Sequence, residues 1–408
     1  MKILFILDEF LPENSGGAAN VAFWLAKGLI KAGNDILVLT ATNDSEFAGK
    51  TEIEGVGIRR IFTSPFGKLR NFKNLKNRAI LKEAKKVFEE FRPDIVHIHS
   101  LHHRFSYGVI GLAKQFSKAV FLTLHDAQTV YNGKLFPKRK MCDLKPVYDY
   151  KISFFDNLKK DGLGLNPFQK FLIKRALKKA DKIFSVSHAL KNALEANGIS
   201  NIETTHNGIN ADEWVGGEAT SNNILFAGRV DEAKGIIALI RVFDAVNFEV
   251  PDAKLTIVGD GDFSPYGRSP EGGKTEKNEN IKILPWQSRE EMKKLFTGAA
   301  VIAVPSLYLD PFPTVNLEAM AAGKPVVGTC FGGTPEVVVN NETGYIANPY
   351  NEKELAEKII DLLKNKEKAA VFGKAGRERV ERMFNIDAQV QKTLEWYDKF
   401  FSHYVVHN

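Results

Sequence analysis

Cysteine and long apolar runs are both scarce in this chain of 408 residues, whose two cysteines are Cys142 and Cys330. Two cysteines provide no disulfide framework of the kind that small secreted domains need, and they favour a reducing compartment. The apolar run after Lys2 extends only from Ile3 to Leu7, which is too short for the core of a signal peptide. No apolar run approaches the length that spans a bilayer, so we expect a cytoplasmic protein.

The G-x-G-x-x-G fingerprint of dinucleotide-binding folds is missing after the first predicted strand, which argues against a dehydrogenase. Instead, Gly16 and Gly17 follow residues 2–7 and open a predicted helix. Two glycines let the backbone approach a ligand closely, and a helix start attracts anions. A tight strand-to-helix turn without a ligand explains the same pair equally well.

The net charge of +7 conceals an asymmetry between the two halves of the chain. Residues 1–200 hold 33 Lys and Arg against 19 Asp and Glu, a net of +14, whereas residues 201–408 hold 23 against 30, a net of −7. Such a split indicates two domains with different partners. The basic half suits anionic lipid, nucleic acid or an acidic substrate, and equally a solvated surface without a partner. Because no nucleic-acid-binding motif accompanies it, we expect no nucleic-acid partner.

Lysines recur at every fourth position in residues 167–182, at Lys170, Lys174, Lys178 and Lys182. A basic amphipathic helix of this kind can lie on an anionic membrane. More often the same stripe is a solvated helix face. Peripheral contact with the inner face of a membrane is therefore a secondary expectation.

Short apolar runs alternate with helical periods almost throughout, which predicts parallel α/β sheets. The pattern restarts after a polar, glycine-rich stretch at 207–223, and residues 127–165 are irregular. The aromatic-rich helix predicted at 387–402 must bury one face, and we expect it to return to the first domain. We therefore predict one Rossmann-like domain of residues 1–205 with 387–408, and a second of residues 206–386.

Strands are predicted at 2–7, 35–40, 57–62, 94–99, 119–124, 182–187, 202–206, 223–228, 254–259, 281–285, 300–304, 324–329 and 344–348. Helices are predicted at 17–32, 78–91, 106–117, 167–180, 188–197, 351–364, 366–383 and 387–402.

The stretch PSLYLDPFPTVNLEAMAAG at 305–323 follows the strand predicted at 300–304. Asp310 falls in the loop beyond that strand, Thr314 is a candidate N-cap, and Glu318 lies one turn into the next helix. Open parallel sheets bind ligands at this edge. A carboxylate there can accept hydrogen bonds from sugar hydroxyls, and the free N–H groups at the helix start can hold a phosphate.

Two cations follow the strand predicted at 223–228, because Gly228-Arg229 leave the strand and Lys234 closes the same loop. Fixed cations at this position can neutralise a diphosphate and stabilise the charge that develops on a nucleotide leaving group. Ordinary loop charges would look the same in the sequence.

Several histidines lie at or near the C-terminal ends of two strands predicted in the first half of the chain. His125 and Asp126 end the strand predicted at 119–124, where His125 can bond a sugar hydroxyl, orient an acceptor or relay a proton, or serve structure alone. The run H-x-H-x-x-H-H at 97–103 suggests a metal, but no cysteine or nearby carboxylate accompanies it. The D-x-D triplet at 260–262 also resembles a metal site, and fits a tight turn better. We expect no metal.

In their order and spacing, these motifs resemble the retaining glycosyltransferases of family four, which have the GT-B architecture of two Rossmann-like, doubly wound domains facing across a cleft. The likeness covers nearly the whole chain. The segments that carry it are Gly16-Gly17, DIVHIHSLHH (94–103), LTLHD (122–126), FSVS (184–187), HNGIN (206–210), FAGRV with Lys234, TIVGDGD, PSLYLDPFPTVNLEAMAAGKPVV and GGTPEVV.

The resemblance implies a retaining transfer of a hexose-type sugar from a nucleotide diphosphate sugar to a hydroxyl acceptor, without a metal or other cofactor. A sugar-nucleotide epimerase and an inactive nucleotide-sugar binding protein are the alternatives. The implied catalytic residues are His125, Asp310, Arg229 and Lys234. The implied donor-binding residues are Gly16, Gly17, Gly228, Arg229, Lys234, Asp310, Thr314, Val315 and Glu318. Acceptor contacts are expected at His99, His102, Asp126, Tyr131 and Arg139.

The sequence departs from the family pattern at one informative place. Asp310 stands where the family has the first glutamate of a pair, and Pro313 replaces the usual glycine after Phe312. The proline removes one backbone N–H donor. Donor-sugar choice cannot therefore be carried over from the family, whereas nucleotide binding through Glu318 is less affected.

Overall fold

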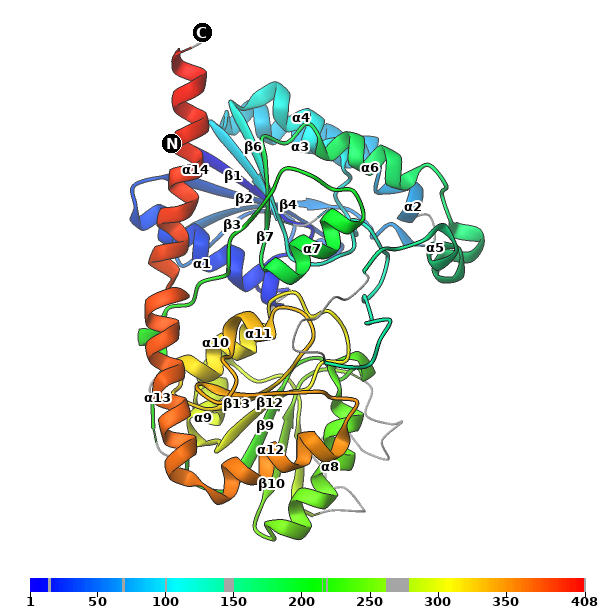
Figure 1. Ribbon diagram of the computed structural model, residues 1–408. Coiled ribbons are helices and arrows are strands. Elements are labelled where there is room, and N and C mark those ends of the chain that lie inside the picture. Colours follow the sequence, from blue (N-terminus) through cyan, green and yellow to red (C-terminus); the bar gives the residue numbers. More distant parts are fainter. Residues whose placement is uncertain are drawn as a thin grey trace. The chain divides into compact units, whose positions relative to one another are not determined.

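The computed structural model describes residues 1–13, 16–67, 70–99, 101–142, 150–214, 216–217, 219–261 and 279–406. The chain forms two compact units. The first comprises Met1–Gly133, Tyr150–Gly208 and Ile386–Asn408, and the second comprises Lys134–Asp149 and Ile209–Asn385. Each unit is built on a sheet of mainly parallel strands (Figure 1).

The first unit contains an eight-stranded sheet in the order β3-β4-β2-β1-β5-β6-β7-β8, in which only β3 runs antiparallel to its neighbour. Its strands are β1 (Lys2–Ile6), β2 (Asp35–Thr42), β3 (Gly49–Ile53), β4 (Val56–Phe62), β5 (Ile95–Ile98), β6 (Ala119–Leu124), β7 (Lys182–Ser185) and β8 (Ile202–Thr204). Its helices are α1 (Gly17–Lys31), α2 (Arg70–Lys73), α3 (Arg78–Phe91), α4 (Gly108–Phe116), α5 (Phe154–Asp161), η2 (Gly162–Gly164), α6 (Gln169–Leu177), α7 (His188–Ala196) and α14 (Ile386–Val406).

The C-terminal helix α14 packs within the first unit, beside α1 (Figure 1). The Tyr397 side chain is fully buried, and its hydroxyl lies 2.6 Å from Nδ1 of His97 on β5. Phe400 meets Phe121 of β6 edge to face, with ring centroids 5.5 Å apart. These aromatic contacts explain why a helix so rich in aromatic residues ends the chain against this sheet.

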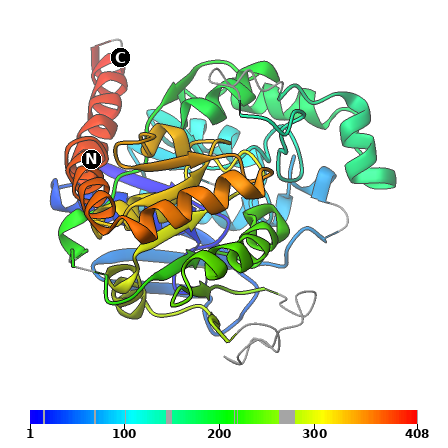
Figure 2. The same ribbon diagram turned by 60° about the horizontal axis from the view of Figure 1, so that its bottom comes forward.

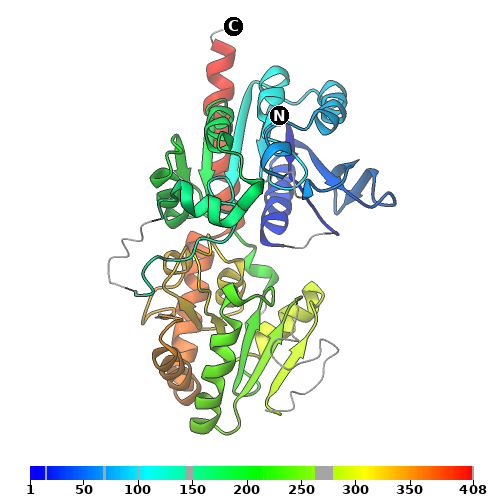
Figure 3. The ribbon, with the colours of Figure 1, turned by 90° about the vertical axis from the view of Figure 1, so that its right-hand side faces the viewer.

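The second unit contains a six-stranded parallel sheet in the order β11-β10-β9-β12-β13-β14, with β11 at one edge (Figure 3). Helices α8 and α12 lie side by side against it (Figure 2). Its strands are β9 (Asn223–Ala227), β10 (Lys254–Val258), β11 (Ile281–Leu284), β12 (Val301–Val304), β13 (Val326–Thr329) and β14 (Gly344–Ala347). Its helices are η3 (Ala211–Glu213), η4 (Glu232–Lys234), α8 (Ile236–Glu249), α9 (Arg289–Gly298), α10 (Thr314–Ala321), α11 (Thr334–Val337), α12 (Glu352–Lys364) and α13 (Lys366–Met383).

Each sheet contains a point at which the strand order reverses. In the second unit the chain runs outward from β9 through β10 and β11, then returns to β12 on the other side of β9. In the first unit the corresponding neighbours are β1 and β5. Ligands of open parallel sheets bind beyond the carboxyl ends of such strand pairs, because the loops diverge there and leave a crevice. The topology thus marks one candidate site in each unit.

Every predicted strand is present, with ends that differ by a few residues, but the strand β3 and the helices α2, α5 and η2 of the first unit were not predicted. The strand β3 has the sequence GKTEI and is largely exposed, so it carries no apolar alternation. Helix α5 lies within residues expected to be irregular. The N-cap of α10 is Pro313, one residue before Thr314, which was the candidate in the sequence.

No helix among the described residues is both long enough and apolar enough to cross a membrane. The two cysteines, from which no disulfide framework was predicted, form a single disulfide between Cys142 and Cys330. They are 188 residues apart in the sequence, so their proximity depends on the tertiary fold.

Candidate functional site

The loops after β9 and β12 meet through an ion pair between two of the predicted site residues. The Lys234 ammonium lies 2.6 Å from Oδ2 of Asp310, and the Ser306 hydroxyl donates to the same oxygen at 2.9 Å. Asp310 is only 5% exposed. Burial works against the charge on Lys234, but Asp310 outweighs it, so the pKa of Lys234 is raised and the group stays protonated at neutral pH.

Tyr308 lies between two lysines at this edge of the sheet. The ammonium of Lys234 is 5.6 Å from the centre of its ring, and that of Lys134 is 5.2 Å from it. Burial raises the pKa of Tyr308, so the phenol stays neutral. Lys134 also forms an ion pair with Asp231, which caps η4 by accepting the Ala233 N–H at 2.8 Å. The loops therefore concentrate positive charge around one aromatic ring.

Two glycines allow these loops to pack closely. Gly235 has φ = +78°, and a Cβ there would lie 1.9 Å from the carbonyl oxygen of Pro305. Gly332 has φ = +72°, and a Cβ there would lie 2.1 Å from the carbonyl oxygen of Asp310. Any side chain at either position would push the loop after β12 out of place. The backbone around Asp310 is thus fixed from both sides.

Helix α10 begins directly after this loop. Its first N–H groups, at Thr314 and Val315, have no acceptor within the helix and can bind an anion. Glu318 is half-buried in the second turn, and burial raises its pKa to about 7, although Arg289 and the Thr314 hydroxyl lower it. Glu318 can therefore change between donor and acceptor near neutral pH.

Arg229 is exposed just beyond β9, after Gly228. It is close enough to Lys134 and Asp231 to affect the pKa of both. The structure therefore brings Arg229, Lys234 and Asp310 together in the loops that follow the adjacent strands β9 and β12, with Glu318 on the helix that comes next after β12. Sequence reasoning missed Lys134, Ser306 and Tyr308. Of these, only Ser306 and Tyr308 lie in the motif that drew attention to the loop.

In the first unit, four predicted residues form two neighbouring pairs beyond β5 and β6. Nδ1 of His99 lies 3.1 Å from Nε2 of His125, and Nε2 of His102 lies 3.2 Å from Oδ1 of Asp126. Asp126 pairs with His102 and not with its neighbour His125, because adjacent residues in an extended segment point in different directions.

Burial determines the protonation of these histidines. It lowers the pKa of His125 to about 4, although Asp126 raises it, and it lowers the pKa of His99 well below the ordinary value. For His102 burial is outweighed by Asp126, so the pKa of His102 is raised.

His97 bonds Tyr397 through one ring nitrogen and Thr123 through the other, at 2.6 and 2.7 Å. Neither nitrogen of His97 is left for a metal.

The loop that carries His102 is fixed by Asp8, which lies just after β1. Asp8 accepts hydrogen bonds from four consecutive backbone N–H groups, those of residues 102–105. Gly16 is the N-cap of α1, and Gly17 is its first residue, and both are exposed. The carboxyl ends of β1 and β5 in this unit thus present a helix start and a hydrogen-bonded loop.

The remaining acceptor candidates, Tyr131 and Arg139, belong to different units. Tyr131 lines a cavity of about 240 Å³ in the first unit, together with Gln128, Asn157 and Lys170. The Gln128 side chain bonds Asp126 at 2.9 Å, which connects the cavity wall to the histidine pairs. Arg139 is exposed in the second unit.

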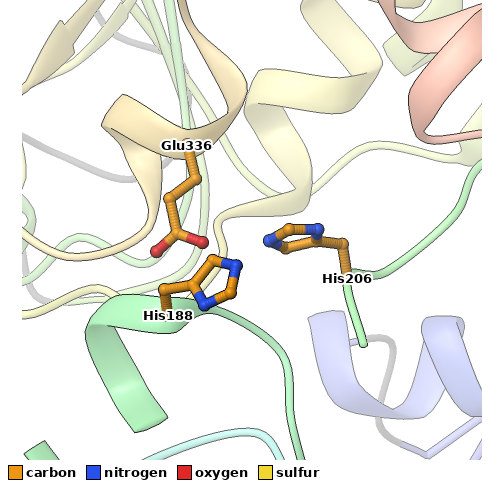
Figure 4. A group of neighbouring side chains, drawn as sticks. All are labelled: His188, His206 and Glu336. Carbon is orange, nitrogen blue, oxygen red and sulfur yellow. The ribbon is translucent and has the colours of Figure 1, made fainter. Parts of the chain in front are cut away.

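Two further histidines of the first unit face each other outside these pairs. His188 begins α7 and His206 follows β8, and their ring centroids lie 5.6 Å apart (Figure 4). Nδ1 of His188 also lies 3.2 Å from the Thr204 hydroxyl. Glu336, the third labelled residue, stands in the first turn of α11 in the second unit. Asp262, of the D-x-D triplet, lies outside the described residues.

Two family models match consecutive parts of the chain. The model described as Glycosyltransferase Family 4 matches residues 15–213, and the model described as Glycosyl transferases group 1 matches residues 208–379. Their junction falls at the passage from the first unit into the second.

Similar proteins extend over nearly the full chain. Spore coat protein SA of Bacillus subtilis is 26% identical, covering 98% of this chain and 100% of its own length. A glycogen synthase of Mycobacterium tuberculosis is 23% identical, with coverage of 97% and 94%. Among solved structures, sucrose-phosphate synthase from Thermosynechococcus elongatus has a TM-score of 0.76 at 22% identity, covering 98% of this chain and 99% of its own. Anabaena HepE in complex with UDP-glucose has a TM-score of 0.66 at 19% identity, with coverage of 97% and 99%.

Proposed function

The chain belongs to the group 1 glycosyltransferases of family 4, and on that premise we propose that it transfers a hexose-type sugar to a hydroxyl acceptor with retention of the anomeric configuration. It is a glycosyltransferase of the GT-B fold that uses a nucleotide sugar. Supporting the proposal most directly is the Lys234–Asp310 ion pair beside Arg229, at the strand-order reversal of the second unit. Cations and a carboxylate at one such point match a diphosphate joined to a sugar.

Arg229, Lys234 and the first N–H groups of α10 bind the diphosphate in this proposal. They stabilise the negative charge that develops when the bond between the sugar and the diphosphate breaks. Asp310 accepts a hydrogen bond from the sugar, since both of its side-chain bonds to described residues end on Oδ2. Glu318 accepts bonds from the ribose hydroxyls. The acceptor hydroxyl attacks from the face that the diphosphate leaves, and the leaving phosphate oxygen takes its proton.

In this proposal, His99 and His125 of the first unit act as neutral hydrogen-bond partners for the acceptor. A histidine whose pKa is about 4, such as His125, holds no extra proton at pH 7 and is a weak base. It can still orient a hydroxyl, and His99 fixes one of its ring nitrogens. We assign hydroxyl recognition, rather than proton transfer, to this pair.

Incubation with labelled UDP-, GDP- and ADP-sugars and a panel of hydroxyl acceptors tests the proposal. Nucleotide release that depends on an added acceptor, with retention in the product, supports sugar transfer. Sugar inversion without an acceptor would indicate an epimerase instead. Binding without any turnover would indicate an inactive nucleotide-sugar binding protein, and either result would refute the proposed function.

We also propose that the first unit touches anionic membranes through α5 and α6. Phe155 on α5, Phe168 at the N-cap of α6 and Phe171 on α6 are between 64% and 75% exposed. Lys159 and Lys160 lie in the last turn of α5. Exposed aromatic rings beside lysines suit the headgroup region of anionic lipid.

Vesicle cosedimentation tests the membrane contact. We expect the protein to bind vesicles that contain phosphatidylserine, less so at high salt, and the variant Phe155→Ser/Phe171→Ser to lose this binding. The matched control is Phe248→Ser, because Phe248 is 84% exposed on α8 of the second unit. Equal sedimentation with neutral vesicles, or equal loss in the control, would contradict the contact.

A further inference from the structure

Residues 134–142, named here the strap, cross the carboxyl ends of several strands of the second unit (teal in Figure 3). The Leu309 N–H, after β12, donates to the Leu135 carbonyl at 2.8 Å. The Asn348 side chain, after β14, donates to the Lys140 carbonyl at 3.0 Å. Cys142 closes the far end through its disulfide to Cys330, after β13. The strap is therefore attached to the loops that carry the proposed donor site.

Lys134, at the near end of the strap, points its ammonium into this site. It pairs with Asp231 in the loop after β9, and it lies over the Tyr308 ring that Lys234 also approaches. Arg229 and Lys234 both act on it electrostatically. The cationic side chains of Lys134, Lys234 and Arg229 therefore lie close to one another and to two carboxylates, those of Asp231 and Asp310.

Such a cluster carries an excess positive charge at an edge that is half-buried. Like charges this close repel each other, and partial burial strengthens the repulsion. An anion that bridges the cations relieves it. A diphosphate, with at least two negative charges and several acceptor oxygens, suits that position better than a single carboxylate does.

We propose that Lys134 is a third diphosphate-binding residue, held in place by the strap. The inference rests on the proposed function, since it assumes a nucleoside diphosphate in this site. It adds a contact from a segment outside the motifs of the second unit. The competing explanation is that Lys134 only anchors the strap through Asp231.

Binding of UDP, GDP and ADP, compared with the matching nucleosides, separates these explanations. Using whichever diphosphate the wild-type protein binds, we expect Lys134→Met to weaken its affinity by about 10- to 100-fold, the range for one charged hydrogen bond. Affinity for the nucleoside should not change, and Lys134→Arg should retain most of the diphosphate affinity. A loss that is equal for nucleoside and diphosphate, or no loss at all, would overturn the proposal.

Lys140→Met is the matched control on the same strap. Lys140 lies over the Tyr350 ring at 4.8 Å, after β14, and not beside Tyr308. It should leave diphosphate affinity unchanged, and an equal loss in this variant would also overturn the role of Lys134. Cys142→Ser releases the far end of the strap, so it should weaken diphosphate binding selectively and by less than Lys134→Met. Wild-type protein that binds none of the three diphosphates would refute the proposed function itself, which is a separate result.

Discussion

Replacing Lys234 with methionine removes an ammonium but keeps most of the volume of the side chain. The structure predicts two separate losses, because Lys234 both pairs with a buried carboxylate and faces the proposed diphosphate. At 2.6 Å the Coulomb energy of the pair is about 6 kcal/mol at an effective dielectric of 20. The Lys234 side chain is 21% exposed, so in the variant water partly takes the place of the missing ammonium. We expect the variant to lose ~3 kcal/mol of unfolding free energy, at the low end for a broken buried pair.

A loss of that size lowers the melting temperature of the second unit by roughly 6–12 °C. Turnover should also fall, by about 10²- to 10³-fold, the range for one lost transition-state donor. The two effects can be separated with the double variant Lys234→Met/Asp310→Asn. It no longer leaves a buried carboxylate unpaired, so we expect most of the stability to return.

The decisive comparison is kcat of the double variant against kcat of Asp310→Asn alone, measured as acceptor-dependent nucleotide release. If Lys234 stabilises the departing diphosphate, the double variant stays at least tenfold slower. Equal turnover in the two proteins would show that Lys234 only neutralises Asp310. Calorimetry on all four proteins gives the coupling energy of the pair from the same set.

Three further changes test other parts of the site. Glu318 has a pKa of about 7, above its ordinary 4.5, so as pH rises between these values the unfolded chain loses a proton that the folded chain keeps, and stability falls. Calorimetry across pH should show this slope vanish in Glu318→Gln, and nucleotide affinity of the wild type should rise through pH 7 as Glu318 becomes an acceptor. Gly332→Ala should destabilise the protein by ~1–3 kcal/mol more than Gly323→Ala, because both have positive φ but only Gly332 would meet backbone atoms. Cys142→Ser should lower the unfolding free energy by ~2–4 kcal/mol, and a reductant should have the same effect on the wild type but none on the variant.

The strands that position the second site were predictable because each is a buried apolar run followed by glycine or proline. β9 and β12 both have this pattern, so Arg229, Lys234 and Asp310 could be placed at carboxyl ends from the sequence. The sequence pattern does not show that β9 and β12 are neighbours, because this depends on the strand order in the sheet. The family resemblance implied only that Arg229, Lys234 and Asp310 bind the same donor.

Contacts made by irregular segments could not be predicted. Lys134 lies 97 residues before Asp231 and in a stretch without periodicity, so nothing local links the two. The pairing of His102 with Asp126 depends on the course of the loop after β5, which Asp8 fixes from β1. In each case the partner is chosen by tertiary packing, which periodicity does not encode.

The two units differ in the kind of polar group that they place at the strand-order reversal. The second unit keeps Lys234 charged against burial, because Asp310 compensates. Among the described residues of the first unit, His99 and His125 have no acidic partner in hydrogen-bond contact, and burial makes both neutral. Charged groups can stabilise a departing diphosphate, whereas neutral imidazoles can only give or accept hydrogen bonds. The same difference implies that Glu318, whose pKa is about 7, contributes a pH dependence of turnover near neutrality, whereas His99 and His125 do not.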